Sequence, residues 1–335
     1  MSRRCGSDTP KVDHLFTISQ WRLITAAIQP SGVFGFSIVY LIVTVRAQYS
    51  FREPTGSVLM RSLQVEGFSL VDTLECGQTF CWVKEGEGYI NADIGQVVYV
   101  EQRGDTLLYD TSDNDVDLSK LFRLEDPLDQ IHREITRDGI MKKSIDFAPN
   151  LRIINDPFFP CLVSFLCSVW KNVPAIRGMT NSIRENWGTS YEFRGKTVYG
   201  MPTPGQLSNA TVSELKKLGL AWRSEFIVKS TEVIVAGEIS ENKLRNMDYI
   251  EAHKQLKKLH GVGDKVADCV SLFSLGFLEA FPIDVWIERV IQEHYGVFTT
   301  TGKSYSKKAE AARNYFGRYA GYAQEYLYHY SRCAV

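Results

Sequence analysis

The chain has 335 residues, of which 44% are hydrophobic and 23% charged. These are ordinary globular values, and they exclude collagen-like, disordered and polytopic membrane proteins. The net charge of −1 conceals an asymmetry, because residues 51–150 carry 10 basic and 19 acidic side chains whereas residues 151–335 carry 23 and 18. Bulk attraction to a polyanion is therefore not expected, but the basic second half permits a local anion-binding face. The seven cysteines form no Cys-x-x-Cys pair, which excludes a zinc ribbon and an iron–sulfur framework.

The first 59 residues contain a nearly continuous apolar run over residues 33–45. These thirteen residues are fewer than the roughly 20 that span a bilayer. The run lies far from the first residue and no small-residue cleavage site follows it, which speaks against a signal peptide. We interpret residues 1–59 as an extension of doubtful origin and expect the natural product to start at Met60, with an apolar membrane segment and a signal peptide as the alternatives.

The next region has the pattern of a β-sheet. Residues 97–100 and 106–109 are strand-like runs, and Arg103-Gly104-Asp105 between them is typical of a hairpin turn. From about Asp156 onward helical patterns dominate, beginning with apolar residues that recur at helical spacing from Leu162 to Trp170. We predict an α+β chain, with a small antiparallel β-sheet domain over residues 60–150 and an α-helical domain over residues 151–335.

One segment of the helical region has the pattern of two helices joined by a glycine turn. A helix ends near His260, Gly261-Val262-Gly263 form the turn, and a second helix starts near Asp264. Such a turn directs backbone N–H groups and a helix N-terminus at a phosphate, and glycine lets the backbone approach it closely. Alone, this is a weak signal for DNA binding.

Lys265 and Asp284 are the candidate catalytic pair of this segment. A lysine amine without its proton is a nucleophile that forms Schiff bases. Asp284 lies 19 residues further on, directly after Phe281-Pro282-Ile283. Taken singly, Lys265 fits a solvated lysine at a helix edge and Asp284 fits an N-cap. The combination with the glycine turn favours catalysis.

The turn, Lys265 and Pro282-Ile283-Asp284-Val285 together resemble the helix–hairpin–helix, Gly-Pro-Asp superfamily of DNA base-excision glycosylases. Within it, LHGVGDKVADCV followed by FPIDVW is similar to the 8-oxoguanine DNA glycosylase family. The resemblance extends from about residue 63 to residue 332. Further matching segments are residues 74–82 (LECGQTFCW), 156–168, 218–223 (LGLAWR) and 319–324 (YAGYAQ).

The resemblance implies a bifunctional enzyme that flips 8-oxoguanine, and related oxidised purines, out of double-stranded DNA. Lys265 would attack C1′, release the base and hold the sugar as an imine, after which β-elimination nicks the strand. Asp284 would stabilise positive charge at C1′. Gly77 would accept the N7 proton that distinguishes 8-oxoguanine from guanine. The implied base-binding residues are Gly77, Gln78, Phe80, Asp268, Cys269, Gln324 and Tyr328.

The implied contacts with the rest of the DNA include departures from the family pattern. These contacts are Asn172, Trp222, Arg223, Gly261, Val262, Gly263 and Trp286. Trp170-Lys171-Asn172 stand where much of the family has asparagines, and the arginine that pairs with the orphaned cytosine falls near Ala175. Trp222 replaces a wedging tyrosine. We therefore expect only a modest preference for cytosine opposite the lesion.

The resemblance requires no cofactor and no iron–sulfur cluster, and it allows a structural cation at the hairpin. It implies a monomer that binds double-stranded DNA containing 8-oxoguanine and has no membrane partner. The protein would be nuclear in a eukaryote and cytoplasmic, with the nucleoid, in a prokaryote.

Three alternatives remain. An alkylated-base glycosylase of the same superfamily acts with the aspartate alone, so Lys265 speaks against it. A pyrimidine glycosylase of the endonuclease III type carries a four-cysteine cluster, of which only Cys333 is present. A non-catalytic helix–hairpin–helix DNA-binding protein would not need Lys265 and Asp284 together.

Overall fold

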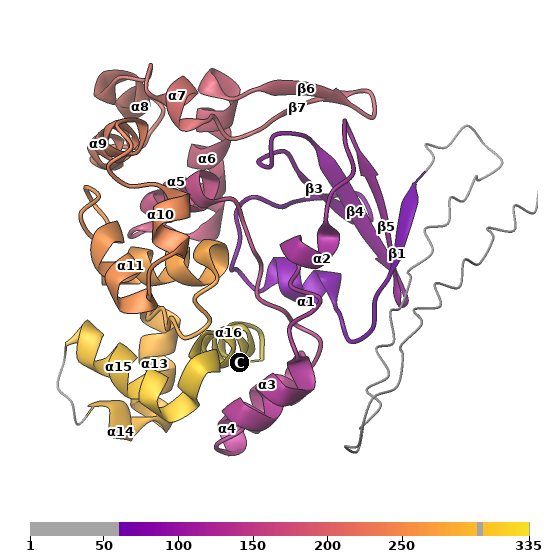
Figure 1. The fold of residues 1–335 in the computed structure, drawn as a ribbon, viewed down its shortest axis with the longest axis vertical. Coiled ribbons are helices and arrows are strands. Elements are labelled where there is room, and N and C mark those ends of the chain that lie inside the picture. Colours follow the sequence, from indigo (N-terminus) through magenta and orange to yellow (C-terminus); the bar gives the residue numbers. More distant parts are fainter. Residues whose placement is uncertain (1–59, 300–303, 335) are drawn as a thin grey trace, which may run out of the picture. The chain divides into compact units, whose positions relative to one another are not determined.

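The computed structural model describes residues 60–299 and 304–334 (Figure 1). The interpretation of residues 1–59 as an extension concerns residues that lie outside this description. Among the described helices, none has both the length and the apolar character needed to cross a membrane.

The predicted antiparallel sheet is present and has five strands in the order β1-β5-β4-β3-β2. The predicted hairpin joins β4 to β5, with Arg103 opposite Thr106 and a two-residue turn between them. The strands are β1 (Arg61–Gln64), β2 (Val83–Glu85), β3 (Gly88–Asn91), β4 (Val98–Arg103) and β5 (Thr106–Thr111).

Short helices accompany the sheet and lead into the larger helical region. They are α1 (Leu70–Glu75), α2 (Leu118–Leu121), α3 (Leu128–Ile135) and α4 (Gly139–Phe147). Of these, α1 lies between β1 and β2 in the chain, so the segment that follows it, residues 76–82, connects a helix to the edge of the sheet. This segment contains three of the predicted base-binding residues.

Helices dominate the remainder, as predicted. They are α5 (Phe158–Ser168), α6 (Val173–Trp187), α7 (Pro204–Leu207), α8 (Val212–Lys217), α9 (Arg223–Val235), α10 (Glu241–Arg245), α11 (Tyr249–Leu256), α12 (Asp264–Val270), α13 (Val285–His294), α14 (Gly296–Thr299), α15 (Tyr305–Phe316) and α16 (Ala320–Cys333). A π-helical turn, Ser271–Leu275, follows α12, and a 3₁₀ turn, Gly317–Tyr319, precedes α16.

A second hairpin, formed by β6 (Ser190–Phe193) and β7 (Lys196–Tyr199), interrupts the helical region and was not predicted from the sequence. Phe193 packs in a small apolar cluster with Ala92, Val97 and Tyr99 of the sheet region. The hairpin therefore links α6 to the sheet. Figure 1 shows β6 and β7 extending from the helical region toward the strands.

The helix predicted from Leu162 to Trp170 differs from expectation at its C-terminal end. α5 stops at Ser168, and its residues from Phe158 to Cys167 are all buried. It is thus a helix buried on all sides rather than one with a single apolar face. Trp170 lies beyond the helix end and is 90% exposed.

One hydrophobic core extends from the sheet into the helices, so the two regions share an interior. It includes Trp82 beside the sheet, Phe165 of α5 and Tyr326 of α16. α16 packs against α3, α4, α13 and α15, and in Figure 1 it is seen nearly end-on among them. α13 and the segment that carries Gly77 therefore both lie against α16.

Candidate active site

The helix–hairpin–helix element forms as predicted, from α11, the glycine turn and α12. Gly261 has a φ of +83°, and a Cβ there would lie 2.1 Å from the Phe226 ring, so this position requires glycine. A Cβ at Gly263 would meet nothing within 4 Å, so this residue faces open space at the start of α12. Val262 is buried and its N–H donates to the Leu259 carbonyl. Val262 therefore packs into the core, and its contact with DNA stays a prediction.

Lys265 lies half-buried in the first turn of α12. Its Nζ is 3.3 Å from Ser168 Oγ and 4.9 Å from the centre of the Phe165 ring. The side chain therefore lies back over α5 and is not a solvated lysine at a helix edge. One turn further on, burial raises the pKa of the Cys269 thiol to about 12, although the charge of Lys265 opposes this. The Cys269 thiol is therefore uncharged beside the Lys265 amine.

Asp284 is the N-cap of α13. Its Oδ1 accepts hydrogen bonds from the backbone N–H groups of Trp286 and Ile287, each at 2.9 Å. Burial raises the pKa of the Asp284 carboxyl, while these two N–H groups and the charge of Lys265 act in the opposite direction. The N-cap interpretation is correct, and it fixes the carboxylate within the electrostatic reach of Lys265.

Gly77 lies against two side chains of α16. Its φ is +113°, and a Cβ there would lie 2.5 Å from Arg332 Nη1 and 3.0 Å from Cε1 of Tyr328. Arg332 Nη1 donates to the Cys76 carbonyl at 2.9 Å and to the Tyr328 hydroxyl at 3.3 Å. Position 77 therefore needs glycine both for its backbone and for its surroundings.

Gln324 of α16 has an unsatisfied buried acceptor. The residue is 4% exposed, and its Oε1 has no hydrogen-bond partner among the described residues. A buried amide oxygen without a partner is unfavourable, which indicates a place for a ligand donor.

The catalytic pair and the predicted base pocket lie in one place. Burial raises the pKa of Tyr328 to about 12, and the charge of Asp284 adds to this shift. The same charge contributes to raising the pKa of Cys269. The charge of Asp284 therefore acts on both predicted sandwich residues, Cys269 on α12 and Tyr328 on α16, and the charge of Lys265 acts on Asp284.

Comparison with known proteins agrees with this geometry. A family model described as "8-oxoguanine DNA glycosylase, N-terminal domain" matches residues 61–162. The "Probable N-glycosylase/DNA lyase" of Methanothermobacter thermautotrophicus is 30% identical over 218 residues, which cover 58% of this chain and 68% of the relative. The chain belongs to the 8-oxoguanine DNA glycosylase family. The "N-glycosylase/DNA lyase OGG1" of Arabidopsis thaliana is 28% identical over 277 residues, covering 76% of this chain and 75% of the relative.

Solved structures show the same family fold. The apo-form of the Clostridium acetobutylicum 8-oxoguanine glycosylase/lyase superposes with a TM-score of 0.76 at 29% identity, covering 85% of this chain and 99% of that one. The same enzyme in complex with double-stranded DNA containing cytosine opposite 8-oxoG gives the same TM-score and identity, covering 86% and 98%. The predicted α+β glycosylase fold is thereby confirmed.

Gln78, predicted to bind the base, has another use in this family member. Its Nε2 donates to the carbonyls of Thr73 and Arg152 at 2.7 and 2.8 Å, and its Oε1 accepts from the N–H of Ile154 at 2.8 Å. Both amide hydrogens and the carbonyl oxygen are engaged with the backbone. Gln78 therefore anchors the segment that carries Gly77. Its contact with a base stays a prediction.

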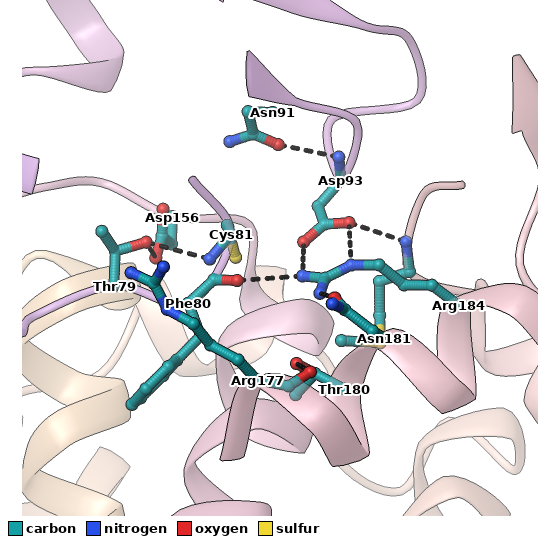
Figure 2. A network of polar contacts seen from close by, with 11 residues as sticks. Thr79, Phe80, Cys81, Asn91, Asp93, Asp156, Arg177, Thr180, Asn181 and Arg184 are labelled. Atoms are coloured by element: carbon teal, nitrogen blue, oxygen red, sulfur yellow. Dashed lines mark hydrogen bonds and ion pairs between the residues drawn. The ribbon is translucent and has the colours of Figure 1, made fainter. Parts of the chain in front are cut away.

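Phe80 lies next to the ring beneath Lys265. The rings of Phe80 and Phe165 meet edge to face, with centroids 5.7 Å apart. Phe80 is thus placed at the border of the site, while its backbone carbonyl faces the other way and accepts a hydrogen bond from Arg184 (Figure 2).

Asp268 is enclosed by protein. Its carboxylate accepts hydrogen bonds from the hydroxyls of Tyr249 and Tyr305, and His253 Nε2 lies 3.4 Å from Oδ1. Burial raises the pKa of Asp268, with His253 and the two tyrosines opposing the shift. The residue has no exposed surface, and Asp268 ties α12 to α11 and α15. Its contact with a base stays a prediction.

A buried ion pair that the sequence analysis missed supports the base-binding segment (Figure 2). Arg184 of α6 donates to both carboxylate oxygens of Asp93, at 3.1 and 2.6 Å, and to the Phe80 carbonyl at 3.0 Å. Asp93 also accepts the N–H of Met201 at 2.7 Å. The pair thus fixes the sheet, α6 and the site segment together. Its only sequence signal is an arginine on the apolar face of α6.

Trp222 and Arg223, both predicted to contact DNA, differ in solvent exposure. Trp222 is 42% exposed, whereas Arg223 is 2% exposed. The guanidinium of Arg223 packs 4.1 Å from the Trp222 ring, and its Nε and Nη2 both donate to the Val169 carbonyl. Two of its three guanidinium nitrogens thus hold the loop after α5, and the expected contact of Arg223 with a cytosine stays a prediction.

Asn172 and Trp286 each lie at the start of a helix. The Asn172 side chain accepts the N–H of Ala175 at 3.1 Å and caps α6. Trp286 is half-buried, and the Arg289 guanidinium lies 5.1 Å from its ring centre. Their contacts with DNA stay predictions.

Proposed function

We propose that the protein excises 8-oxoguanine from double-stranded DNA through a Schiff base on Lys265 and then nicks the strand by β-elimination. The observation that carries the proposal is the convergence of Lys265, Asp284 and a pocket with an unsatisfied acceptor, in a chain of this family. The relatives named N-glycosylase/DNA lyase support the same two activities.

The pocket residues suit the lesion chemically. Gln324 Oε1 offers an acceptor to the Watson–Crick donors of a guanine, and Tyr328 and the neutral Cys269 offer faces between which a flat base can stack. The Gly77 carbonyl is assigned to the N7–H, which 8-oxoguanine has and guanine lacks. A base that leaves any of these groups unpaired binds less well, because an unmade buried hydrogen bond costs about 1–3 kcal/mol.

The chemical steps follow from the two catalytic residues. The unprotonated amine of Lys265 forms a bond to C1′ as the C1′–N9 bond breaks, and the base leaves with the electron pair and takes up a proton. Asp284 stabilises the positive charge that develops at C1′. The sugar ring opens to give an imine, which loses a proton from C2′, and the C3′–O bond then breaks with release of the 3′ phosphate.

The test is reductive trapping with borohydride on matched duplexes. Duplexes with 8-oxoguanine, undamaged guanine, an alkylated purine or an oxidised pyrimidine at one position distinguish the alternatives. We expect a covalent adduct and a nicked product with the 8-oxoguanine duplex alone. An adduct only with the pyrimidine lesion, or base release without any adduct, would overturn the proposal.

A further inference from the structure

The loop between α5 and α6 presents an indole to solvent in an unusual backbone conformation. Trp170 is 90% exposed and has a φ of +57°. Tryptophan is enriched at binding interfaces relative to the rest of a protein surface. A left-handed conformation at a residue with a bulky side chain costs free energy and is found mainly where function requires it.

A second exposed indole lies on the neighbouring loop, and the two loops are held together. Trp222 follows Ala221, which also has a positive φ, of +52°. Arg223 donates to the carbonyl of Val169, the residue before Trp170, while its guanidinium packs on the ring of Trp222. The Phe226 ring packs edge to face against the Trp222 ring, with the two ring centroids 5.0 Å apart. The two loops are therefore joined to each other in the protein without DNA.

Part of the hydrogen-bonding capacity at this place is already used within the protein. Ala175 has no side-chain donor, and two of the three guanidinium nitrogens of Arg223 donate to the Val169 carbonyl. The Asn172 side-chain oxygen is used to cap α6. What the two loops do offer is aromatic area, and aromatic rings stack on any of the four bases.

We propose that Trp170 stacks on the base left unpaired opposite the lesion, while Trp222 wedges into the vacated stack. This inference rests on the proposed function, because it assumes that the lesion is flipped out. The orphaned base is then held by its face, which all bases share, and not by its hydrogen-bonding edge. The role of Trp170 is to position the opposite strand; it takes no part in the chemistry at C1′.

The test uses duplexes that the enzyme binds but cannot cleave. A tetrahydrofuran abasic analogue replaces the lesion, and the opposite position carries a base or a second tetrahydrofuran. Trp170→Asn removes the ring while keeping a residue that tolerates the left-handed conformation, and Trp170→Phe keeps a ring as the matched control. Trp222→Ala is the comparison variant on the other loop.

For the wild type we expect binding to weaken roughly tenfold when the opposite base is removed, the range typical of one stacked base. Trp170→Asn should weaken binding roughly tenfold when the base is present and less than about twofold when it is absent. Trp170→Phe should keep most of the affinity. Trp222→Ala should weaken both complexes alike.

A second readout observes the stacking directly. With 2-aminopurine as the opposite base, binding of the wild type should leave its fluorescence quenched, and binding of Trp170→Asn should raise it. Equal losses of affinity on both duplexes, or unchanged quenching in Trp170→Asn, would overturn the inference. Because neither duplex contains 8-oxoguanine, this outcome is separate from a failure of the excision activity.

Discussion

The proposed lesion pocket and the proposed face toward the opposite strand differ in how they are built. In the pocket, Gly77 lies on a segment whose neighbour Gln78 has its amide engaged with the backbone, and Gln324 presents a buried acceptor. On the opposite-strand face, Trp170 and Trp222 are exposed and their loops are joined through Arg223. The pocket is a set of directional groups fixed by the core, whereas the other face is aromatic surface.

This difference indicates where selectivity originates. Buried donors and acceptors discriminate strongly, because a wrong partner leaves one of them unpaired. Exposed rings contribute affinity with little discrimination. We therefore expect the protein to be strict about the base that it removes and tolerant about the base opposite, and the following changes test each half of this contrast.

Removing the amine should have the largest effect. Lys265→Gln should abolish base release and the trapped adduct, because the imine requires a primary amine. DNA binding should stay within about 1–2 kcal/mol, since phosphate contacts carry most of the affinity. Trapping and equilibrium binding measured on the same 8-oxoguanine duplex check both expectations. An adduct that persists would place the nucleophile on another residue.

Breaking the ion pair beneath the pocket segment should have the next largest effect. Arg184→Met leaves the buried Asp93 carboxylate unpaired and frees the Phe80 carbonyl, so we expect a loss of about 3–5 kcal/mol in the free energy of unfolding. Urea denaturation measures it. Lys142→Met breaks the exposed Lys142–Asp146 pair and serves as the control, with little change expected. Similar losses in both variants would contradict the view that the pocket segment depends on the core.

The parts predicted from the sequence are those with local signals. The β4–β5 hairpin and the glycine turn before Lys265 are each encoded within a few neighbouring residues. The structure has both where the sequence placed them.

The parts that were missed depend on distant partners. Asp93 and Arg184 are 91 residues apart in the chain, and Gln78 bonds to Arg152 across 74. Asp268 was placed in the pocket because it precedes Cys269, yet tyrosines from α11 and α15 enclose it. No local pattern reveals such contacts. For Trp170, the prediction from helical spacing placed the end of the helix two residues beyond the observed end of α5 at Ser168.

A buried acid next to Gln324 should make the stability of the protein sensitive to pH. Glu325 is buried beside Gln324, its Oε1 lacks a partner among the described residues, and burial raises its pKa to about 7. Cys76, His329 and Arg332 act against this shift, and Asp284 adds to it. Because the folded state keeps the proton that the unfolded state loses, stability should fall as pH rises from about 4.5 to 7 and stay level above that.

Glu325→Gln removes this titration. We expect the variant to match the wild type near pH 5 and to exceed it by about 1–3 kcal/mol near pH 8. Asp156, whose pKa burial also raises to about 7, stays in both proteins and contributes equally to each. Urea denaturation across this pH range is the measurement. Parallel pH curves for the two proteins would show that Glu325 does not titrate in the folded state.

The smallest effect concerns the base opposite the lesion, where the aromatic face is expected to be tolerant. With Ala175 lacking a donor and Arg223 committed to Val169, we expect single-turnover excision of 8-oxoguanine to vary within roughly tenfold among the four opposite bases, with a modest preference for cytosine.

Ala175→Arg places a guanidinium in the first turn of α6, at the position where the family's cytosine-pairing arginine falls. One well-placed hydrogen-bonding group gives about 1–3 kcal/mol of discrimination. The variant should therefore excise opposite cytosine with an advantage several-fold greater than that of the wild type. A hundredfold cytosine advantage in the wild type would instead mean that a side chain other than Arg223 reads the base edge, and the contrast between pocket and face would then fail.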